Sequence, residues 1–268
     1  MKKLKISQIQ FEAKTKPLEN SILLENFYNK TSTFAPDLIC TPECTNIITN
    51  DKKYLFKFAN YQNDCPVLSM SKKYAKKNKV HINLGSLLLK KKGQKKLVNR
   101  SFLIDSYGKI KSYYDKIHMF DVKINQKENY KESQSFKSGK KIILSQFLNT
   151  KFGLTICYDL RFPKLFRKLA KKGAEVILMP AAFTVPTGKA HWEILVRARA
   201  IENNVYVIAT NMCGTHHTNR KTYGHSVLIN PWGKIINKAY KKQRILNTEI
   251  DLIEVTQSRK KIPSLLYE

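Results

Sequence analysis

A cysteine in a setting typical of a nucleophile lies in the stretch GLTICYDLRFP, residues 153–163. The apolar run 151–157 predicts a buried strand that ends at Cys157, and 162–173 predicts an amphipathic helix that begins near Pro163. In α/β proteins functional sites lie at the carboxyl ends of strands, and a nearby helix terminus favours the thiolate form of a cysteine. An inert, buried thiol explains this segment equally well.

Two other segments favour the nucleophile. A thiol that attacks an amide needs a base to accept its proton, and a cation or N–H donors to hold the oxyanion. Glu43 ends the stretch DLICTPE, and Lys116 lies in SYYDKIHMFD, so each follows a predicted strand of its own. His118 is the one nearby histidine, and no Cys–His arrangement is evident. The positions therefore favour a Glu–Lys–Cys set, although singly Glu43 would be an exposed carboxylate and Lys116 a surface lysine.

The elements that must position these residues alternate between strands and helices. Strands are predicted at 3–11, 37–43, 80–89, 174–180 and twice within 100–117, and helices at 18–34, 65–79 and 162–173. The stretches 101–110 and 226–235 match at six of ten positions, each with a strand, a turn that ends in glycine and a returning strand. The alternation predicts the α/β class, and the repeated hairpin predicts two similar sheets packed together.

Composition indicates the setting in which the chain works. Without a Ser/Gly/Pro-rich linker, a chain of 268 residues predicts one large domain over residues 1–268. Its five cysteines are scattered and contain no CxxC pair, which argues against a disulfide framework or a zinc site. The start MKKLKISQIQF is unlike a secretory signal, and no apolar run approaches the length of a membrane span. We therefore expect a reduced, soluble, cytoplasmic protein that does not associate with membranes.

The formal net charge of +29 raises the question of nucleic-acid binding, because clustered Lys and Arg neutralise phosphates. The lysines are spread along the chain, as in 72–79, 89–96 and 137–141, and no recognition motif accompanies them. We therefore expect a solvated basic surface that favours anionic substrates, and no specific binding to DNA or RNA. A basic binding protein without catalytic activity is the alternative outside the enzymes.

Taken together, the motifs resemble those of the carbon-nitrogen hydrolases of the nitrilase superfamily. The resemblance rests on TPE around Glu43, DKIHMFD around Lys116, YKES at Glu132, GLTICYDLRFP around Cys157, and the stretch 187–211. It implies a four-layer αββα sandwich made by a single domain of this type, a homodimer, and no metal or organic cofactor. It also implies Glu43 as general base, Lys116 as oxyanion partner and Cys157 as nucleophile. Glu132 is implied as a supporting glutamate, expected to hydrogen-bond to both Lys116 and Glu43.

The resemblance also implies how a substrate is bound and cleaved. The cysteine takes the acyl group of an amide as a thioester, and water then releases the acid. Tyr158 is expected to offer its backbone N–H to the oxyanion. The loop 181–188 follows a predicted strand, so Ala182 and Phe183 are expected to line the substrate pocket.

Within the superfamily, the stretches 190–204 and 211–233 are most similar to the deaminated glutathione amidases. That similarity predicts a small anionic amide as substrate, with deaminated glutathione cleaved to 2-oxoglutarate and cysteinylglycine. The stretches PECTNII and VKINQKENYKES depart from the usual pattern at the entrance to the site. An ω-amidase acting on α-ketoglutaramate and an N-carbamoyl amidase therefore stay as alternatives.

Other conspicuous residues have structural explanations. Arg197 and Arg199 could reach a substrate carboxylate, but ion pairs with Glu202 or Glu193 explain them better. For the histidines at 216, 217 and 225, no carboxylate or cysteine completes a metal set, so loop packing or dimer contacts are expected. Apolar residues at helical spacing are expected in the core, namely Trp192, Leu195, Ala198 and Ile201.

Overall fold

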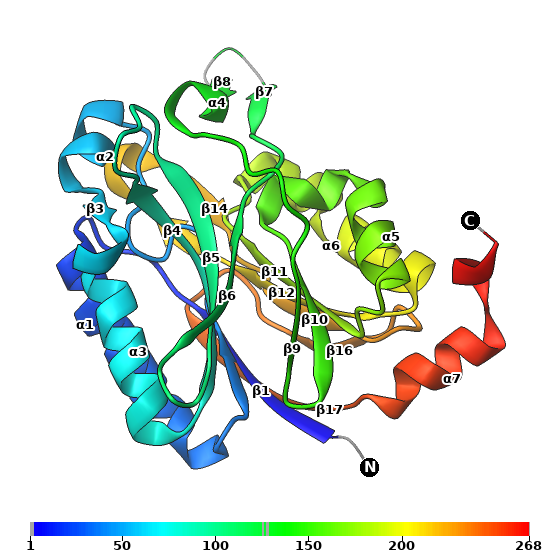
Figure 1. Cartoon of the computed structure of the whole chain (residues 1–268). Helices are drawn as coiled ribbons and strands as arrows, with labels where there is room; N and C mark the ends of the chain where they lie inside the picture. Colours follow the sequence, from blue (N-terminus) through cyan, green and yellow to red (C-terminus); the bar gives the residue numbers. More distant parts are fainter. Residues whose placement is uncertain (1–2, 125, 127–128, 268) are drawn as a thin grey trace.

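The computed structural model describes residues 3–124, 126 and 129–267. Two large β-sheets lie face to face, and helices cover the outer face of each, so the molecule is a four-layer αββα sandwich (Figure 1). The predicted α/β class and its layered arrangement are confirmed. Across the described residues, no helix is both long and apolar enough to cross a membrane.

The first sheet has the strand order β17-β1-β2-β4-β5-β6, and β3 pairs with β4. Its strands are β1 (Lys3–Gln10), β2 (Leu38–Cys40), β3 (Asn60–Tyr61), β4 (His81–Lys90), β5 (Val98–Ile104), β6 (Ile110–Asp115) and β17 (Arg244–Asp251). Neighbours β1, β2 and β4 run parallel, whereas β17, β5 and β6 join antiparallel. Helices α1 (Pro17–Thr31) and α3 (Pro66–Asn78) lie side by side over its outer face (Figure 1).

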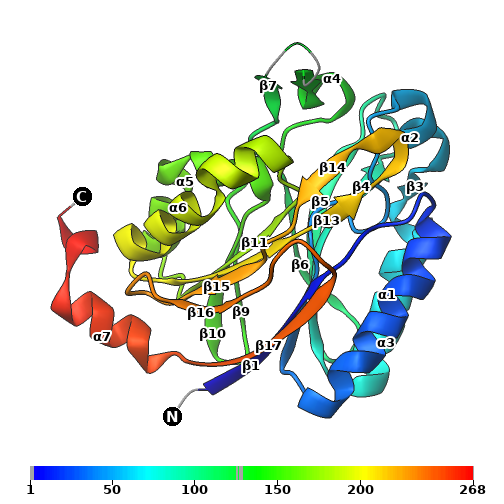
Figure 2. The same cartoon turned by 180° about the vertical axis from the view of Figure 1, so that it is seen from behind.

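The second sheet has the order β16-β15-β12-β11-β10-β9. Its strands are β9 (Leu144–Phe147), β10 (Thr150–Leu154), β11 (Val176–Ala181), β12 (Tyr206–Asn211), β15 (Val227–Ile229) and β16 (Ile235–Lys238). The three strands β10, β11 and β12 are parallel, and α5 (Pro163–Lys171) and α6 (Val185–Asn203) connect them across the outer face (Figure 2).

Shorter elements gather at the upper end of the sandwich as drawn in Figures 1 and 2. They are helix α2 (Lys52–Phe58), the hairpin of β7 (Asp121–Lys123) and β8 (Asn129–Lys131), helix α4 (Glu132–Ser135), and the hairpin of β13 (Cys213–Thr215) and β14 (Lys221–Tyr223). Helix α7 (Ile253–Lys261) follows β17 and leads to the C-terminal end of the chain (Figure 1).

Alternating side chains of the central strands build the core. On β11, Val176 and Leu178 pack between the two sheets, whereas Ile177 and Met179 pack beneath α5 and α6. All four side chains are fully buried. Because both faces of this strand are covered, its sequence is apolar in both directions, and the strand is firmly fixed in position.

The sequence repeat marks equivalent hairpins in the two sheets, as expected. β5 and β6 belong to the first sheet, and β15 and β16 belong to the second. Their turns contain Gly108 (φ 75°) and Gly233 (φ 82°), a backbone conformation that favours glycine. The placement of Ile201 in the core is wrong, because its side chain is 47% exposed. The buried face of α6 includes Ala200, and the next residue on a helix points about 100° away.

Candidate active site

Cys157 lies on a sharp turn between the second sheet and α5. Strand β10 ends at Leu154, earlier than predicted, and a 3₁₀ turn begins at Cys157 itself. The backbone of Cys157 is left-handed, with φ 49°. A non-glycine residue in this region costs about 1–3 kcal/mol, and such strain is concentrated at functional sites. The turn therefore holds the thiol at the carboxyl end of β10 in a fixed orientation.

Glu43 lies beyond the end of β2, where the chain leaves the first sheet. Its Oε1 accepts hydrogen bonds from Lys116 Nζ and Asn99 Nδ2, both at 2.9 Å. Its Oε2 accepts one from the backbone N–H of Ala182, also at 2.9 Å. The loop around Glu43 passes so close to Gly85 that a Cβ there would lie 2.2 Å from the carbonyl oxygen of Pro42. Glycine at this position on β4 thus lets the loop settle against the sheet.

Lys116 follows the last residue of β6 and is 2% exposed. Its Nζ lies 2.8 Å from Glu132 Oε2 and 2.9 Å from Glu43 Oε1, so the ammonium group bridges the two carboxylates. Burial alone would lower the pKa of Lys116, but Glu132 and Glu43 hold that pKa well above its ordinary value. Lys116 is therefore a fixed positive charge within the site.

Glu132 begins α4 and is held from several sides. Its Oε2 also accepts a hydrogen bond from the backbone N–H of Phe120 at 2.6 Å, and Asn99 Nδ2 donates to its Oε1 at 3.3 Å. Glu132 was expected to bond both Lys116 and Glu43. It reaches Glu43 only through Lys116 and Asn99, because two carboxylates need a donor between them.

The surroundings of Glu43 and Cys157 shift the pKa values of both groups, and the thiol differs from the thiolate that the nearby helix terminus favours. Although burial raises the pKa of Glu43, Lys116 and further hydrogen bonds bring that pKa below its ordinary value. For Cys157, burial and the nearby Glu43 carboxylate raise the pKa of the thiol well above its ordinary value, against the effect of Lys116. The resting thiolate favoured by the sequence is thus wrong. The proton lies on sulfur, and the carboxylate beside it is free to accept it.

Asp159 connects the segment of Lys116 to the turn of Cys157. Its Oδ2 accepts hydrogen bonds from the Tyr114 hydroxyl at 2.7 Å and the Ile156 backbone N–H at 2.8 Å. Its Oδ1 lies 2.6 Å from His118 Nδ1, and the His118 ring stacks on Phe162. His118 therefore serves this structural network and does not line the cavity beside Cys157.

A family model described as "Carbon-nitrogen hydrolase" matches residues 5–260. This chain belongs to the carbon-nitrogen hydrolase family. It is 38% identical over 232 residues to a deaminated glutathione amidase of Yersinia enterocolitica, covering 86% of this chain and 81% of that protein. It is 37% identical over 237 residues to a deaminated glutathione amidase of Dictyostelium discoideum, covering 85% and 80%.

Solved structures agree with the family assignment. The Caenorhabditis elegans NitFhit protein has a TM-score of 0.93 at 32% identity, covering 100% of this chain and 65% of that longer chain. Saccharomyces cerevisiae Nit3, described as a member of the nitrilase superfamily, has a TM-score of 0.85 at 26% identity, covering 98% and 95%. This carbon-nitrogen hydrolase is therefore an amidase of the nitrilase superfamily that acts on a small-molecule amide.

The carbon-nitrogen hydrolase has a cavity of about 360 Å³ above these residues. Its floor, which we call the catalytic floor, consists of Glu43, Lys116, Glu132 and Cys157. The residues predicted to bind substrate all line it, namely Tyr158, Ala182 and Phe183. The backbone N–H of Phe183 donates to Asn211 at 3.0 Å, which fixes the loop after β11.

Sequence analysis missed other residues of this hydrolase site. Asn99, on β5, donates to both glutamates, but a polar residue within a predicted strand gave no functional signal. Three basic side chains, which we call the basic mouth, also line the cavity, namely Lys52, Lys131 and Arg220. For Arg220, the one available clue was its position within the stretch 211–233, which is most similar to the amidases.

The remaining polar residues have the structural roles that were expected. Arg199 pairs with Glu202 at 2.8 Å. Arg197 instead donates to the carbonyl oxygen of Gly233, and Glu193 pairs with Lys238. The histidines pack within the loops: His216 Nε2 lies 2.8 Å from Thr222 Oγ1, and the rings at 217 and 225 stack on Tyr54 and Tyr223.

Proposed function

We propose that this amidase cleaves its substrate with Cys157 as nucleophile, Glu43 as general base and Lys116 as oxyanion partner. The observation that carries the proposal is geometric: Glu43 and Lys116 form an ion pair at 2.9 Å and line one cavity with Cys157, where the pKa of Glu43 is lowered and the pKa of the thiol is raised. Amide hydrolysis needs this starting state, because the general base must be deprotonated and the cation must be in place before the thiol attacks.

The first half of the reaction transfers the acyl group to sulfur. Glu43 accepts the thiol proton while Sγ of Cys157 attacks the amide carbon. Lys116 Nζ and the backbone N–H of Tyr158 stabilise the oxyanion. Protonation of Glu43 weakens its attraction for Lys116 and frees an ammonium N–H for that oxyanion. Glu43 then gives its proton to the departing nitrogen, the C–N bond breaks, and a thioester remains.

The second half regenerates the enzyme. Glu43 takes a proton from water, the hydroxyl oxygen attacks the thioester, and the C–S bond breaks. The sulfur regains a proton from Glu43, and the acid leaves. Glu132 keeps Lys116 in place in both halves, since its two oxygens lie within 3.1 Å of Nζ. These steps use no metal or organic cofactor.

The substrate we propose is deaminated glutathione, cleaved to 2-oxoglutarate and cysteinylglycine. The two curated relatives with this name, at 38% and 37% identity, support the assignment. The basic mouth supports an anionic substrate. The alternatives, an ω-amidase acting on α-ketoglutaramate and an N-carbamoyl amidase, release ammonia instead of a dipeptide from the amide.

A product assay tests the substrate. The purified protein is given deaminated glutathione, α-ketoglutaramate and an N-carbamoyl amino acid in parallel, and cysteinylglycine and ammonia are quantified. We expect the highest kcat/KM with deaminated glutathione. A higher kcat/KM with either of the other compounds assigns the enzyme to that alternative, and no turnover of any of them refutes the proposed substrate class.

We also propose that residues 1–268 form one hydrolase domain, that two copies of the chain associate as a homodimer, and that the protein is cytoplasmic. The outer face of α6 exposes Ile194 and Ile201 by 70% and 47%, beside Trp232, which is 58% exposed. Apolar residues seven apart share a helix face, and an apolar surface of this kind favours association. All five cysteines are free thiols, as suits a reducing compartment. Sedimentation equilibrium tests the proposed dimer. A protein that sediments as a monomer at micromolar concentration would refute it.

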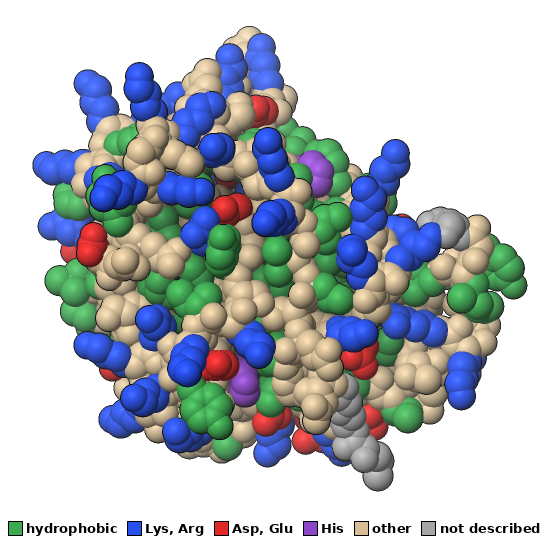
Figure 3. Space-filling view, in the orientation of Figure 1, with side chains coloured by type: hydrophobic (Ala, Val, Ile, Leu, Met, Phe, Trp, Pro, Cys, Tyr) green, Lys and Arg blue, Asp and Glu red, His purple; other side chains and the backbone are tan. Residues whose placement is uncertain are grey.

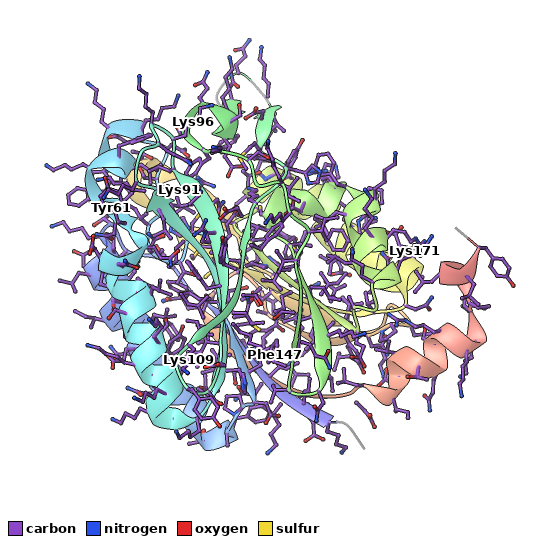
Figure 4. All side chains as sticks on the ribbon, viewed as in Figure 1. Tyr61, Lys91, Lys96, Lys109, Phe147 and Lys171 are labelled. Atoms are coloured by element: carbon purple, nitrogen blue, oxygen red, sulfur yellow. The ribbon has the colours of Figure 1, made fainter. Side chains whose placement is uncertain are left out.

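The basic surface supports no specific nucleic-acid partner. Lys and Arg side chains are spread over the whole visible face of the molecule (Figure 3). Lys91 and Lys96 are both exposed and lie near the end of the sandwich that carries α4 (Figure 4). A dispersed lysine surface of this kind binds polyanions weakly and loses them as salt is raised.

A further inference from the structure

Arg220 is a cation within the cavity that has no acidic partner among the residues that the structure describes. In the described part of the cavity lining the acidic residues are Glu43 and Glu132, and both are bound to Lys116. In the described part of the chain, no carboxylate pairs with Arg220. Its Nε is buried without a hydrogen-bond acceptor, and its Nη1 makes only a long contact of 3.5 Å with Asn50 Oδ1. A buried guanidinium nitrogen without an acceptor is stabilised by an anion, so the position is suited to bind one.

Several contacts hold Arg220 at the cavity. It directly precedes β14, and its carbonyl oxygen accepts a 2.8 Å hydrogen bond from the backbone N–H of His216. The side chain of His217 lies 2.8 Å from Thr49 Oγ1 and stacks on Tyr54, with ring centres 4.2 Å apart. The loop of residues 216–220 thus joins the hairpin of β13 and β14 to the segment before α2, and it places Arg220 at the cavity.

The surroundings favour an anion at this point. Lys52 and Lys131 line the same cavity, and the described lining contains no acidic side chain besides the two of the catalytic floor. Lys52 donates to the neutral Gln134 side chain. Lysine is a flexible point charge, whereas the planar guanidinium of arginine offers paired donors that match a carboxylate. Arg220 is therefore the residue of the basic mouth best suited to read geometry as well as charge.

We propose that Arg220 binds a carboxylate of the substrate, remote from the amide that is cleaved, and thereby selects anionic amides over neutral amides of the same size. Arg197 and Arg199 are unavailable for this role, because they bond Gly233 and Glu202. The inference rests on the proposed function, since it assigns a specificity residue to the same site. Arg220 touches the substrate away from the reacting atoms, so it acts mainly on KM.

The experiment compares matched substrates in the wild type and Arg220→Gln. The substrates are deaminated glutathione, its derivative with the glycine carboxylate amidated, and its derivative with the 2-oxo acid carboxylate esterified. In the wild type, we expect kcat/KM to fall roughly 10–100-fold when the carboxylate read by Arg220 is capped. Arg220→Gln should lose a similar factor on the uncapped substrate, mainly through KM, and should no longer discriminate against that capped compound. Arg220→Lys should be intermediate.

Lys221→Gln provides a matched control, because it removes the same charge at the next residue, which is exposed and outside the cavity lining. It should change kcat/KM by less than about twofold. The inference is wrong if Arg220→Gln discriminates between capped and uncapped substrates as the wild type does, or if Lys221→Gln has the same effect as Arg220→Gln.

A binding measurement separates this inference from the catalytic proposal. The Cys157→Ala variant is titrated by calorimetry with deaminated glutathione, which carries both carboxylates, with and without Arg220→Gln. We expect Arg220→Gln to weaken binding roughly 10-fold or more. Equal affinities contradict the role of Arg220 even where amide turnover by the wild type is established. Weakened binding supports that role even where the wild type fails to cleave deaminated glutathione.

Discussion

The catalytic floor and the basic mouth treat charge in opposite ways. On the floor, Lys116 is fully enclosed and bonded to two carboxylates. At the mouth, Arg220 has no acidic partner in the described part of the chain, and Lys52 and Lys131 are exposed. Charges that are paired before substrate binds fix the geometry of the reacting groups. A charge without a partner can instead bind an opposite charge on the substrate. Under the two proposals, the floor sets the rate of amide cleavage and the mouth sets the selectivity for anionic substrates.

The two regions also differ in what positions them. Glu43, Lys116 and Cys157 each follow a strand of the large sheets, so the packed core fixes their separation. Arg220 belongs to a small separate hairpin, which is joined to the segment before α2 by side-chain contacts. A change in a loop can therefore alter the mouth without moving the floor. Substrate range is freer to vary than chemistry in such an arrangement.

The largest effect is expected from Cys157→Ala. Removal of the nucleophile should lower kcat by roughly 10⁴-fold or more. Melting temperature and circular dichroism should stay close to those of the wild type. Cys65→Ala, a buried thiol outside the cavity lining, is the matched control and should retain activity within a few-fold. Full activity of Cys157→Ala would refute the assignment of the floor.

Lys116→Ala should have the next largest effect. Loss of a preorganised cation at a developing oxyanion lowers kcat by about 10²-fold or more. His118→Ala should be much milder, because the His118 ring bonds Asp159 and stacks on Phe162, outside the cavity lining. Initial rates of both variants are measured with one amide substrate, and thermal melts verify that each is folded. An inactive His118→Ala beside an active Lys116→Ala would show that the base and oxyanion partner are wrongly assigned.

A smaller effect, on stability, is expected at the loop that carries the mouth. Burial lowers the pKa of His216 to about 4 from an ordinary value of 6.5. The folded state therefore binds fewer protons than the unfolded state between these values, and stability falls as pH falls from 6.5 towards 4. His216→Gln should reduce the fall in melting temperature between pH 7.5 and pH 4.5.

His191→Gln is the control for the stability measurement, because His191 is exposed on α6. The reduction in the fall of melting temperature should be larger in His216→Gln than in His191→Gln. An unchanged fall in His216→Gln would contradict a buried, neutral His216 in the folded state.

Sequence reasoning found the floor because strand ends can be recognised locally. Glu43 and Cys157 each come after a short apolar run, and Lys116 follows the second strand of a predicted hairpin, so each position can be recognised as a strand end. The thiolate was predicted wrongly because the sequence shows the helix after Cys157 but not the burial and the carboxylate that raise the pKa of the thiol. Those two influences come from segments far away in the chain.

Asn99 and Arg220 escaped sequence reasoning for a related reason. Asn99 lies within β5, and its side chain contacts two glutamates from other elements, Glu43 beyond β2 and Glu132 at the start of α4. Arg220 lies in a loop whose place is set by contacts of His217 with Thr49 and Tyr54. Neither partner is local, so no spacing along the chain predicts the contact. By contrast, the repeated hairpin was predictable because strand, turn and glycine are all local features.

The most direct test of the account is the mass of the enzyme during turnover. The wild type is mixed with deaminated glutathione, quenched in acid within the first turnovers and measured by intact-protein mass spectrometry. The account predicts a species heavier by the 2-oxoglutaryl group. After digestion the added mass should lie on the peptide that contains Cys157, and it should be absent in Cys157→Ala. Rapid turnover without an acyl adduct under conditions that preserve thioesters, or an adduct on another residue, would contradict Cys157 as the nucleophile.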